Sequence, residues 1–113
     1  MEAGEAVPRP PRKTDFTIRF ATREAKAGWR DLTAVRRNAL VDAWEFLTRN
    51  PLERTALNGP LRDELRTIIR GGESHEVWQL KLNLRDGARI WFYVVGNVVH
   101  LEQVFTAHPN ATK

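Results

Sequence analysis

The sequence predicts an α+β fold in which an N-terminal strand and a helical hairpin precede an antiparallel β-meander. Two patterns predict this order. Apolar side chains recur at helical spacing between residues 22 and 49, and they alternate with polar ones in three runs between residues 76 and 105. A chain of 113 residues with 42% hydrophobic side chains has the size of one domain with one core. We therefore expect one face of the sheet to pack on the helices.

The first residues predict a leader that precedes this domain. The segment VPRPPRK at residues 7–13 is rich in proline, which lacks the amide donor that a helix or an inner strand needs. Residues 1–14 are therefore expected to form a flexible, Pro-rich basic leader, and residues 15–113 a single domain. The leader suits either a solvated tail or an arm that binds RNA.

The first part of the domain predicts a strand and two helices. FTIRF at 16–20 alternates apolar and polar residues, as a half-buried strand does. Thr22 is a plausible N-cap for a helix that reaches about Leu32, and Thr33 can cap a second helix that ends at Asn50-Pro51. The apolar stripe of the second helix comprises Val35, Ala39, Leu40, Ala43, Phe46 and Leu47.

Residues 52–74 fit two interpretations. The spacing of Leu61, Leu65 and Ile68 favours a short helix after the Asn58-Gly59-Pro60 turn, and a strand that starts near Leu65 fits nearly as well. Gly71-Gly72 ends either element.

Three strands follow, separated by two turns that contain glycine. EVWQLKLNL at 76–84, ARIWFYVV at 88–95 and VVHLEQVF at 98–105 all alternate, and Arg85-Asp86-Gly87 and Gly96-Asn97 suit hairpin turns. The side chains expected to face the helices are Trp78, Leu80, Leu82, Leu84, Ile90, Phe92, Val94, Val99, Leu101 and Phe105.

The opposite, outer face of the sheet would then be polar and aromatic. Alternation places on it Gln79, Lys81, Arg89, Trp91, Tyr93, His100, Glu102 and Val104. The same count adds Thr106 and His108, although a single β-bulge would reverse it. Such a face offers cations for phosphate and rings for base stacking, as an RNA-binding surface does.

Three of these residues suit RNA cleavage without a metal. That reaction needs a base for the 2′-hydroxyl, cations for the phosphoryl oxygens and an acid for the departing 5′-oxygen. Arg89 is the best cation because a guanidinium stays charged and binds phosphate with two parallel donors. His108 is the best proton donor or acceptor, and Lys81 adds positive charge or acts as a base.

The same residues also have purely structural interpretations. A lysine or arginine on an exposed strand is commonly a solvated charge, and a histidine before Pro-Asn is commonly a loop residue. Trp91 and Tyr93 more commonly pack under the N-terminal strand or a tail than bind bases. His75, His100 and His108 match no compact spacing of metal ligands, so we expect no metal and no other cofactor.

Composition narrows the class of protein further. The net charge is +4, and residues 1–30 hold seven Lys/Arg against four Asp/Glu, a surplus of 7 − 4 = +3. There is no cysteine, no apolar run long enough to span a membrane and no apolar segment typical of a secretory signal. We expect a cytoplasmic protein that does not enter membranes.

The ordered series AKAGWRDL, FLTRNPL, LNGPLRDEL, VWQLKLN, ARIWFYVV and VVHLEQVFTAHPNATK resembles the RelE/ParE toxin superfamily over residues 16–113, most closely its RelE-type branch. The resemblance implies a β-α-α-β-β-β fold and a type II toxin-antitoxin toxin that cleaves mRNA in the ribosomal decoding site. It implies no metal or other cofactor. It also implies a cognate antitoxin as partner and a basic surface that contacts ribosomal RNA.

Site residues carry over by position. Lys81 and Arg89 match basic catalytic residues of RelE-like toxins, whereas Gln79 stands where RelE has another lysine. His108 falls near the catalytic histidine of some relatives, with Pro109 in place of their following tyrosine. The expected catalytic set is Lys81, Arg89 and His108, and the expected RNA-binding set is Gln79, Trp91, Tyr93 and Lys113.

Two other functions stay open on the same scaffold. A ParE-like toxin inhibits DNA gyrase and needs no acid-base pair beside a phosphate-binding cation. A catalytically inactive, RNA-binding member would fit the absent lysine and tyrosine.

Overall fold

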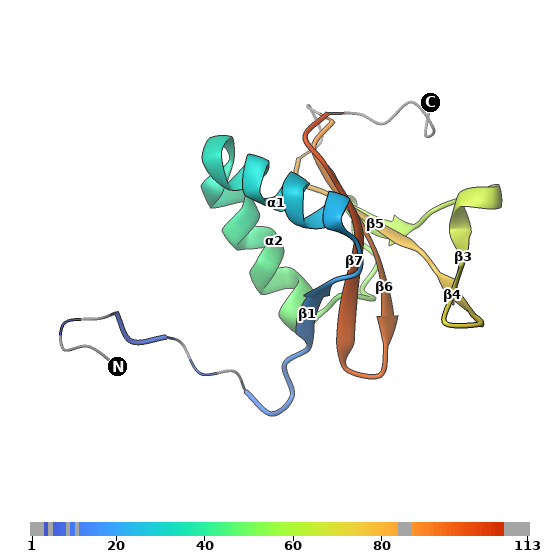
Figure 1. The fold of residues 1–113 in the computed structure, drawn as a ribbon, viewed down its shortest axis with the longest axis horizontal. Helices are drawn as coiled ribbons and strands as arrows, with labels where there is room; N and C mark the ends of the chain where they lie inside the picture. Colours follow the sequence, from blue (N-terminus) through green and yellow to red (C-terminus); the bar gives the residue numbers. More distant parts are fainter. Residues whose placement is uncertain (1–3, 5, 9, 11, 84–86, 108–113) are drawn as a thin grey trace.

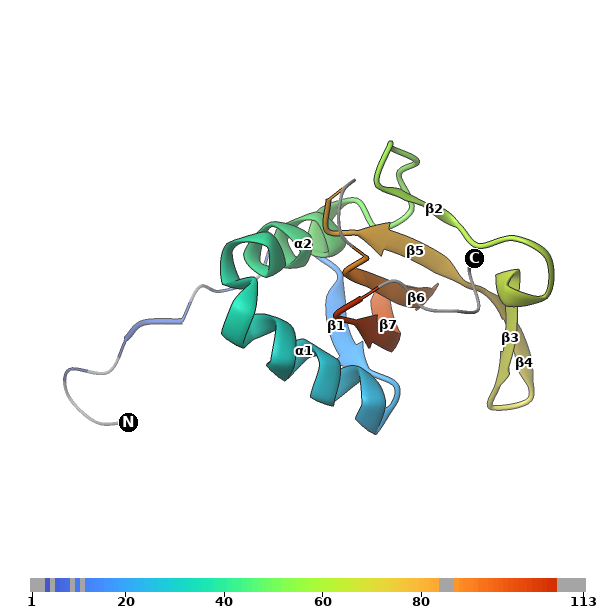
Figure 2. The same ribbon diagram turned by 90° about the horizontal axis from the view of Figure 1, so that it is seen from above.

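A five-stranded sheet with two helices on one face and a separate β-hairpin on the other forms the domain (Figures 1 and 2). The computed structural model describes residues 4, 6–8, 10, 12–83 and 87–107. The predicted α+β class, with a strand and two helices before antiparallel strands, is confirmed. The elements are β1 (Thr17–Phe20), α1 (Arg23–Val35), α2 (Arg37–Arg49), β2 (Asn58–Pro60), a 3-10 helix (Asp63–Arg66), β3 (Thr67–Arg70), β4 (Glu73–Glu76), β5 (Trp78–Lys81), β6 (Arg89–Val95) and β7 (Val98–Phe105).

The sheet has the strand order β1-β7-β6-β5-β2. β5, β6 and β7 form the predicted antiparallel meander, and the short β2 pairs with β5. β1 pairs in parallel with β7, so the N-terminal strand closes one edge. A parallel pair needs a long crossover, and here the chain from α1 to β6 provides it.

The two helices form as the sequence predicts, except at their junction. Thr22 caps α1 by accepting a hydrogen bond from Ala25 N at 3.0 Å. The prediction that Thr33 caps the second helix is wrong, because its hydroxyl donates to the carbonyl of Trp29 inside α1. α1 therefore continues to Val35, whose side chain is exposed. α2 ends at Arg49, next to Asn50-Pro51, where the sequence predicts its end.

The core lies between the helices and the sheet. Gly28 lets α1 approach the sheet closely, since a Cβ there would lie 2.0 Å from the carbonyl oxygen of Val104. The Thr22 hydroxyl donates to the carbonyl of Glu102 and joins the start of α1 to β7. The buried residues of this core are Ala25, Leu32, Leu40, Ala43, Leu47, Trp78, Leu80, Ala88, Ile90, Phe92, Val99, Leu101 and Val104.

A β-bulge in β7 changes which side chains face the helices. Trp91 pairs with Gln103 whereas Phe92 pairs with Leu101, so Glu102 is an extra residue in the β7 strand. An extra residue shifts the alternation by one position.

The residues after the bulge consequently lie on the faces opposite to those predicted. Val104 packs in the helix-covered core, and Phe105 contacts Trp91 on the outer face with ring centroids 4.8 Å apart. The predictions for Val104 and Phe105 are therefore wrong. The shift also removes the basis for placing Thr106 and His108 on the outer face, and His108 itself lies outside the described residues.

The segment that fitted two interpretations contains both a helical turn and a hairpin. A single turn of 3-10 helix leads into β3, and Gly71 and Gly72, both with positive φ, turn the chain into β4. The β3–β4 hairpin lies on the side of the sheet away from the helices (Figure 2). It therefore covers part of the face that the sequence predicts to be open.

Before β1, the described part of the leader contains no helix or strand and runs away from the domain (Figure 1). Asp15 ends this stretch: it is buried, and its carboxylate accepts from Arg12 N at 3.0 Å. None of the helices in the described part of the chain is long and apolar enough to cross a membrane.

Candidate functional site

A pocket of about 510 Å³ opens where β2 and β5 meet the outer face. Residues 55–63 and Leu65 form one wall, and Gln79, Lys81 and Arg89 form the other. The structure thus brings together three of the residues that the sequence assigns to the site. We call this hollow the cationic pocket.

Strand pairing holds the three side chains in register. Lys81 on β5 lies directly opposite Arg89 on β6, and Gln79 lies opposite Trp91. The side-chain oxygen of Gln79 accepts from Arg89 Nη1 at 3.1 Å and from Trp91 Nε1 at 2.9 Å. Arg89 Nε donates to the carbonyl of Gly87 at 3.0 Å. Gln79 therefore orients Arg89.

Arg89 is buried, with 5% of its surface exposed. Its place on the outer face leads to the expectation of an exposed side chain, and this expectation is wrong, because the Arg89 side chain contacts Gln79 of β5 and the carbonyl of Gly87. Burial lowers the pKa of Arg89 from its ordinary value, since a charge is less stable away from water. Among the described residues no carboxylate forms an ion pair with it. An anion that entered the pocket would supply the missing negative charge.

The net charge of the residues that line the pocket also favours the binding of an anion. Arg62, Lys81 and Arg89 are cations and Asp63 is the single acid, which gives a formal charge of 3 − 1 = +2 among the described lining residues. A guanidinium and an ammonium on facing strands form a site for the oxygens of phosphate.

Asn58 holds the wall opposite these cations. Its side-chain amide donates to the carbonyls of Pro51 at 3.0 Å and Glu53 at 2.8 Å, and its backbone N–H donates to the Thr55 hydroxyl. Lys81 N donates to the carbonyl of Leu57 at 2.8 Å, which joins this loop to β5. The prediction that Asn58-Gly59-Pro60 forms a turn is wrong, because these residues form β2 and pair with β5. Their role as a wall of the pocket depends on that pairing.

Trp91 and Tyr93 are covered by protein. Their exposed fractions are 9% and 6%. Trp91 packs with Leu61 and Val77, and the ring of Tyr93 is stacked between two histidine rings. The expectation that alternation leaves these rings open to bases is wrong, because the β3–β4 hairpin and the residues beside it cover them.

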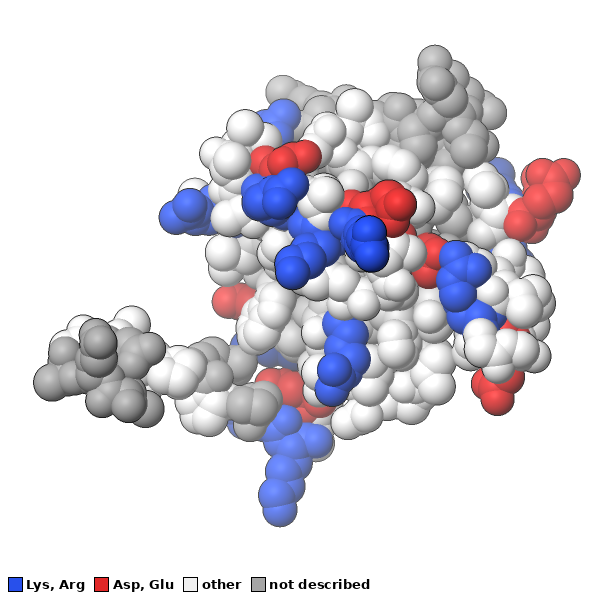
Figure 3. Space-filling model, in the orientation of Figure 1, with Lys and Arg blue, Asp and Glu red and all other residues white. Residues whose placement is uncertain are grey.

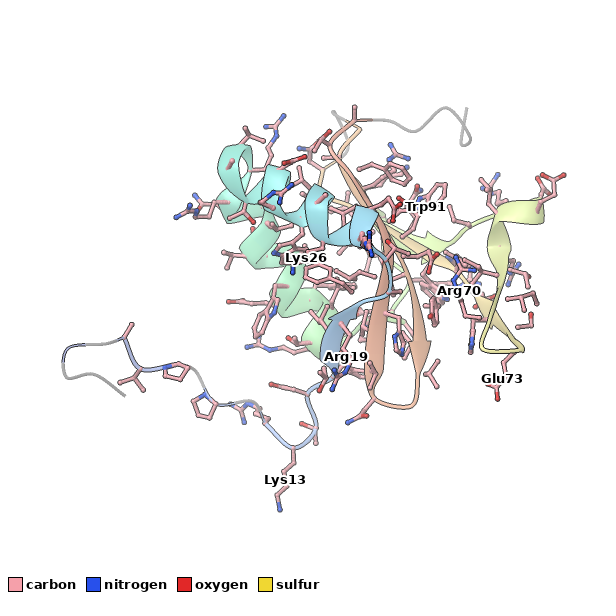
Figure 4. All side chains as sticks on the ribbon, viewed as in Figure 1. Lys13, Arg19, Lys26, Arg70, Glu73 and Trp91 are labelled. Atoms are coloured by element: carbon pink, nitrogen blue, oxygen red, sulfur yellow. The ribbon has the colours of Figure 1, made fainter. Side chains whose placement is uncertain are left out.

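The contacts around Tyr93 attach the hairpin to the sheet. His75 of β4 stacks on Tyr93 at 4.7 Å between centroids, and His100 of β7 stacks on its other side at 4.9 Å. Arg70 of β3, which Figure 4 labels, forms an ion pair with the buried Glu102 of β7. We call these five residues, Arg70, His75, Tyr93, His100 and Glu102, the hairpin contact cluster.

The pKa values in this cluster follow from its contacts. The hydrogen bond to Glu102 raises the pKa of Arg70. Burial, followed by the negative charge of Glu102, raises the pKa of Tyr93. Burial lowers the pKa of His100, and the charges of His75 and Arg19 lower it further.

The two described histidines are distant from the cationic pocket. Tyr93, on which both stack, follows Arg89 by four residues on β6, which is about 13 Å along a strand. His108 and Lys113, which the sequence assigns to the site, lie outside the described residues. Within the described ranges no group of three or more His, Cys, Asp or Glu side chains could hold a metal ion.

A second basic surface lies on the other edge of the sheet. Arg23, Lys26 and Arg30 of α1 are exposed at helical spacing, and Arg19 of β1 is exposed beside them. Figure 3 shows the cationic side chains gathered on this side, and Figure 4 labels Arg19 and Lys26. Its charge also suits a polyanion.

Comparisons of the chain with protein-family models, with curated proteins and with solved structures find no match.

Proposed function

We propose that the protein is a RelE-type toxin of a type II toxin-antitoxin system that cleaves mRNA on the ribosome. One observation supports the proposal most strongly. Arg89 is a buried cation with no acidic partner among the described residues, and it lies opposite Lys81 in an open pocket. Such an arrangement favours the binding of a phosphate group.

The binding of phosphate would offset the desolvation of Arg89. The pocket keeps the guanidinium in place through Gln79 and Gly87 before any ligand arrives. Pre-positioned donors stabilise the charge that develops on phosphoryl oxygens without reorganisation during the reaction. Lys81 would supply a second positive charge to the same oxygens.

The proposed reaction is an internal transfer at phosphorus. The 2′-oxygen loses its proton to a base and forms a bond to phosphorus, and the bond from phosphorus to the 5′-oxygen breaks. The departing 5′-oxygen takes a proton from an acid, for which we propose His108. The products are a 2′,3′-cyclic phosphate and a 5′-hydroxyl, and atoms and charge balance without a metal.

The partners and location follow from this activity. The exposed cations of α1 and β1 would bind the phosphates of ribosomal RNA, while the cationic pocket receives the mRNA. We propose a cognate antitoxin that neutralises the pocket, and a cytoplasmic protein, where ribosomes translate.

Toeprinting of an mRNA on translating ribosomes tests the proposal. Wild type should cut the mRNA in the decoding site, and Arg89→Ala should lower the cleavage rate by about 10²–10³-fold, as the loss of a transition-state donor does. Arg49→Ala is the matched control, because Arg49 is an exposed cation at the end of α2, outside the pocket.

Other outcomes would contradict the proposal in distinct ways. A toxic wild type that leaves the mRNA intact would exclude the endonuclease and favour a ParE-like toxin, which a DNA gyrase supercoiling assay would then detect. Binding of RNA without toxicity or cleavage would favour an inactive RNA-binding member. Equal cleavage by Arg89→Ala and wild type would place the active site elsewhere.

A further inference from the structure

Asp63 is the single carboxylate among the described residues that line the cationic pocket. It follows the exposed Arg62, and both face the hollow that Lys81 and Arg89 form from the sheet. No hydrogen bond or ion pair joins the Asp63 side chain to another described residue. Asp63 therefore lies in a pocket with three cations and has no ionic partner among the described residues.

The backbone at Asp63 is in an unusual conformation. Its φ is 54°, and in the described part of the chain it is the one non-glycine residue with positive φ. Aspartate tolerates this left-handed region better than most residues, but it is still uncommon there. Residues held in such conformations concentrate at functional sites.

Two structural roles for Asp63 lack the contacts they require. It does not cap the 3-10 helix that it begins, because the cap position belongs to Arg62 and no side chain bonds to that end. It does not neutralise the pocket cations either, since it forms an ion pair with none of them.

The charges of the pocket indicate a role in proton transfer for the Asp63 carboxylate. A pocket that only held phosphate would bind it more tightly without a negative charge in its wall, because like charges repel. An ionised carboxylate beside a bound phosphodiester can instead accept a proton.

We propose that Asp63 is the general base of the cleavage reaction. Its carboxylate accepts the proton of the 2′-hydroxyl as the 2′-oxygen bonds to phosphorus, and the 5′-oxygen departs with a proton from the general acid. The protonated Asp63 then loses its proton to water, which restores the site. This assignment rests on the proposed endonuclease function.

The substitution Asp63→Asn tests the assignment with little change in shape. Asparagine also tolerates positive φ, and its amide cannot accept the proton. Glu64→Gln is the matched control: Glu64 is the next residue, it is an exposed acid, and it lines a different hollow. Single-turnover cleavage on ribosomes gives the rate. Binding of a short RNA with a 2′-deoxy nucleotide at the cleavage position gives the affinity.

A general base predicts opposite effects on these two measurements. Asp63→Asn should cleave about 100-fold or more slowly. It should bind the uncleavable RNA as tightly as wild type or a few-fold more tightly, because a repulsive charge is gone. Glu64→Gln should match wild type throughout.

Each alternative result is distinguishable. A rate for Asp63→Asn within about threefold of wild type would overturn the role of Asp63 and leave the endonuclease intact. A parallel loss of rate and affinity would show that Asp63 only shapes the pocket. Absence of cleavage by wild type would refute the proposed function itself. If Asp63→Asn does not fold, Asp63→Gly removes the carboxylate while accepting the same φ.

Discussion

The outer face of the sheet carries one buried charged side chain at each end, and the two differ in whether an oppositely charged residue pairs with them. Glu102 and Arg89 are equally buried, at 5% exposure. Glu102 has Arg70 as its partner under the β3–β4 hairpin, whereas Arg89 has no acidic partner among the described residues and borders an open pocket. The same strands thus carry a covered end, where Glu102 is paired with Arg70, and an open end, where Arg89 has no acidic partner in the described part of the chain.

This difference shows what the hairpin does. It covers the aromatic and acidic end of the face and leaves the cationic end accessible. Groups that are paired contribute to stability, whereas an unpaired buried cation lowers stability unless a ligand binds. The open end is therefore the place where binding energy can be used for function.

Replacement of Arg89 by methionine should have the largest effect and should separate function from stability. Arg89→Met should lower mRNA cleavage by about 10²–10³-fold, because the phosphate loses its main cation. The melting temperature should stay the same or rise, since the substitution removes a buried charge that has no acidic partner within the described ranges. Calorimetry beside the cleavage assay would check both. A large fall in melting temperature would mean that Arg89 is structural, like Glu102.

A substitution at Gly28 tests how closely α1 packs on the sheet. Both ends of the outer face belong to the same sheet and depend on this packing. Gly28→Ala should destabilise the fold by about 3 kcal/mol, because the new Cβ would overlap the backbone of Val104. Gly59→Ala is the control, since a Cβ there meets nothing within 4 Å, and it should stay within about 0.5 kcal/mol of wild type. Urea unfolding would measure both. Equal stability of the two variants would contradict the close approach of α1.

Arg70→Ala should lower stability and leave cleavage nearly unchanged, which is the reverse of the result expected for Arg89→Met. The loss of its partner leaves Glu102 buried and unpaired, so the melting temperature should fall. Cleavage by the folded fraction should change little, because Arg70 lies outside the cationic pocket. A loss of cleavage without a loss of stability would place the functional end of the sheet under the hairpin.

The smallest expected effect is a dependence of stability on pH through His100, which stacks on Tyr93. The pKa of His100 lies below its ordinary value of 6.5 because of burial, His75 and Arg19. The folded protein therefore binds this proton less readily than the unfolded chain, and stability should decline as pH falls below 6.5 toward the lower folded-state pKa.

Melting temperatures from about pH 8 to about pH 5 would measure this decline. His100→Gln should show a smaller decline than wild type. Glu76, whose pKa is held below 4.5 by its hydrogen bond from Arg66, should contribute only at lower pH. A decline of the same size in wild type and variant would assign the effect to other groups.

Local patterns predicted the elements well and the pairing between distant elements less well. The alternation in residues 78–101 placed Lys81, Arg89 and Gln79 on one face, because side chains in a regular strand must alternate. The count failed beyond Glu102, since an extra residue in β7 has no signature in hydrophobic alternation. The parallel pairing of β1 likewise depends on a distant strand.

The remaining errors come from the segment before β5. Leu61, Leu65 and Ile68 have helical spacing because they pack on Val77 and Trp91 from a single 3-10 turn and a strand. Strand alternation alone predicts that Trp91 and Tyr93 are open to solvent, because it does not show that the β3–β4 hairpin covers them. The wall that Asn58 holds and the conformation of Asp63 depend on backbone geometry that residue types alone do not specify.

The most direct test of the central claim is an NMR titration of the full chain with a short RNA that carries a 2′-deoxy nucleotide at the cleavage position. The amide signals of Gln79, Lys81 and Arg89 should shift together and saturate, while those of Tyr93 and His100 should stay in place. Shifts that gather at Tyr93 and His100 and spare the cationic pocket would contradict the account.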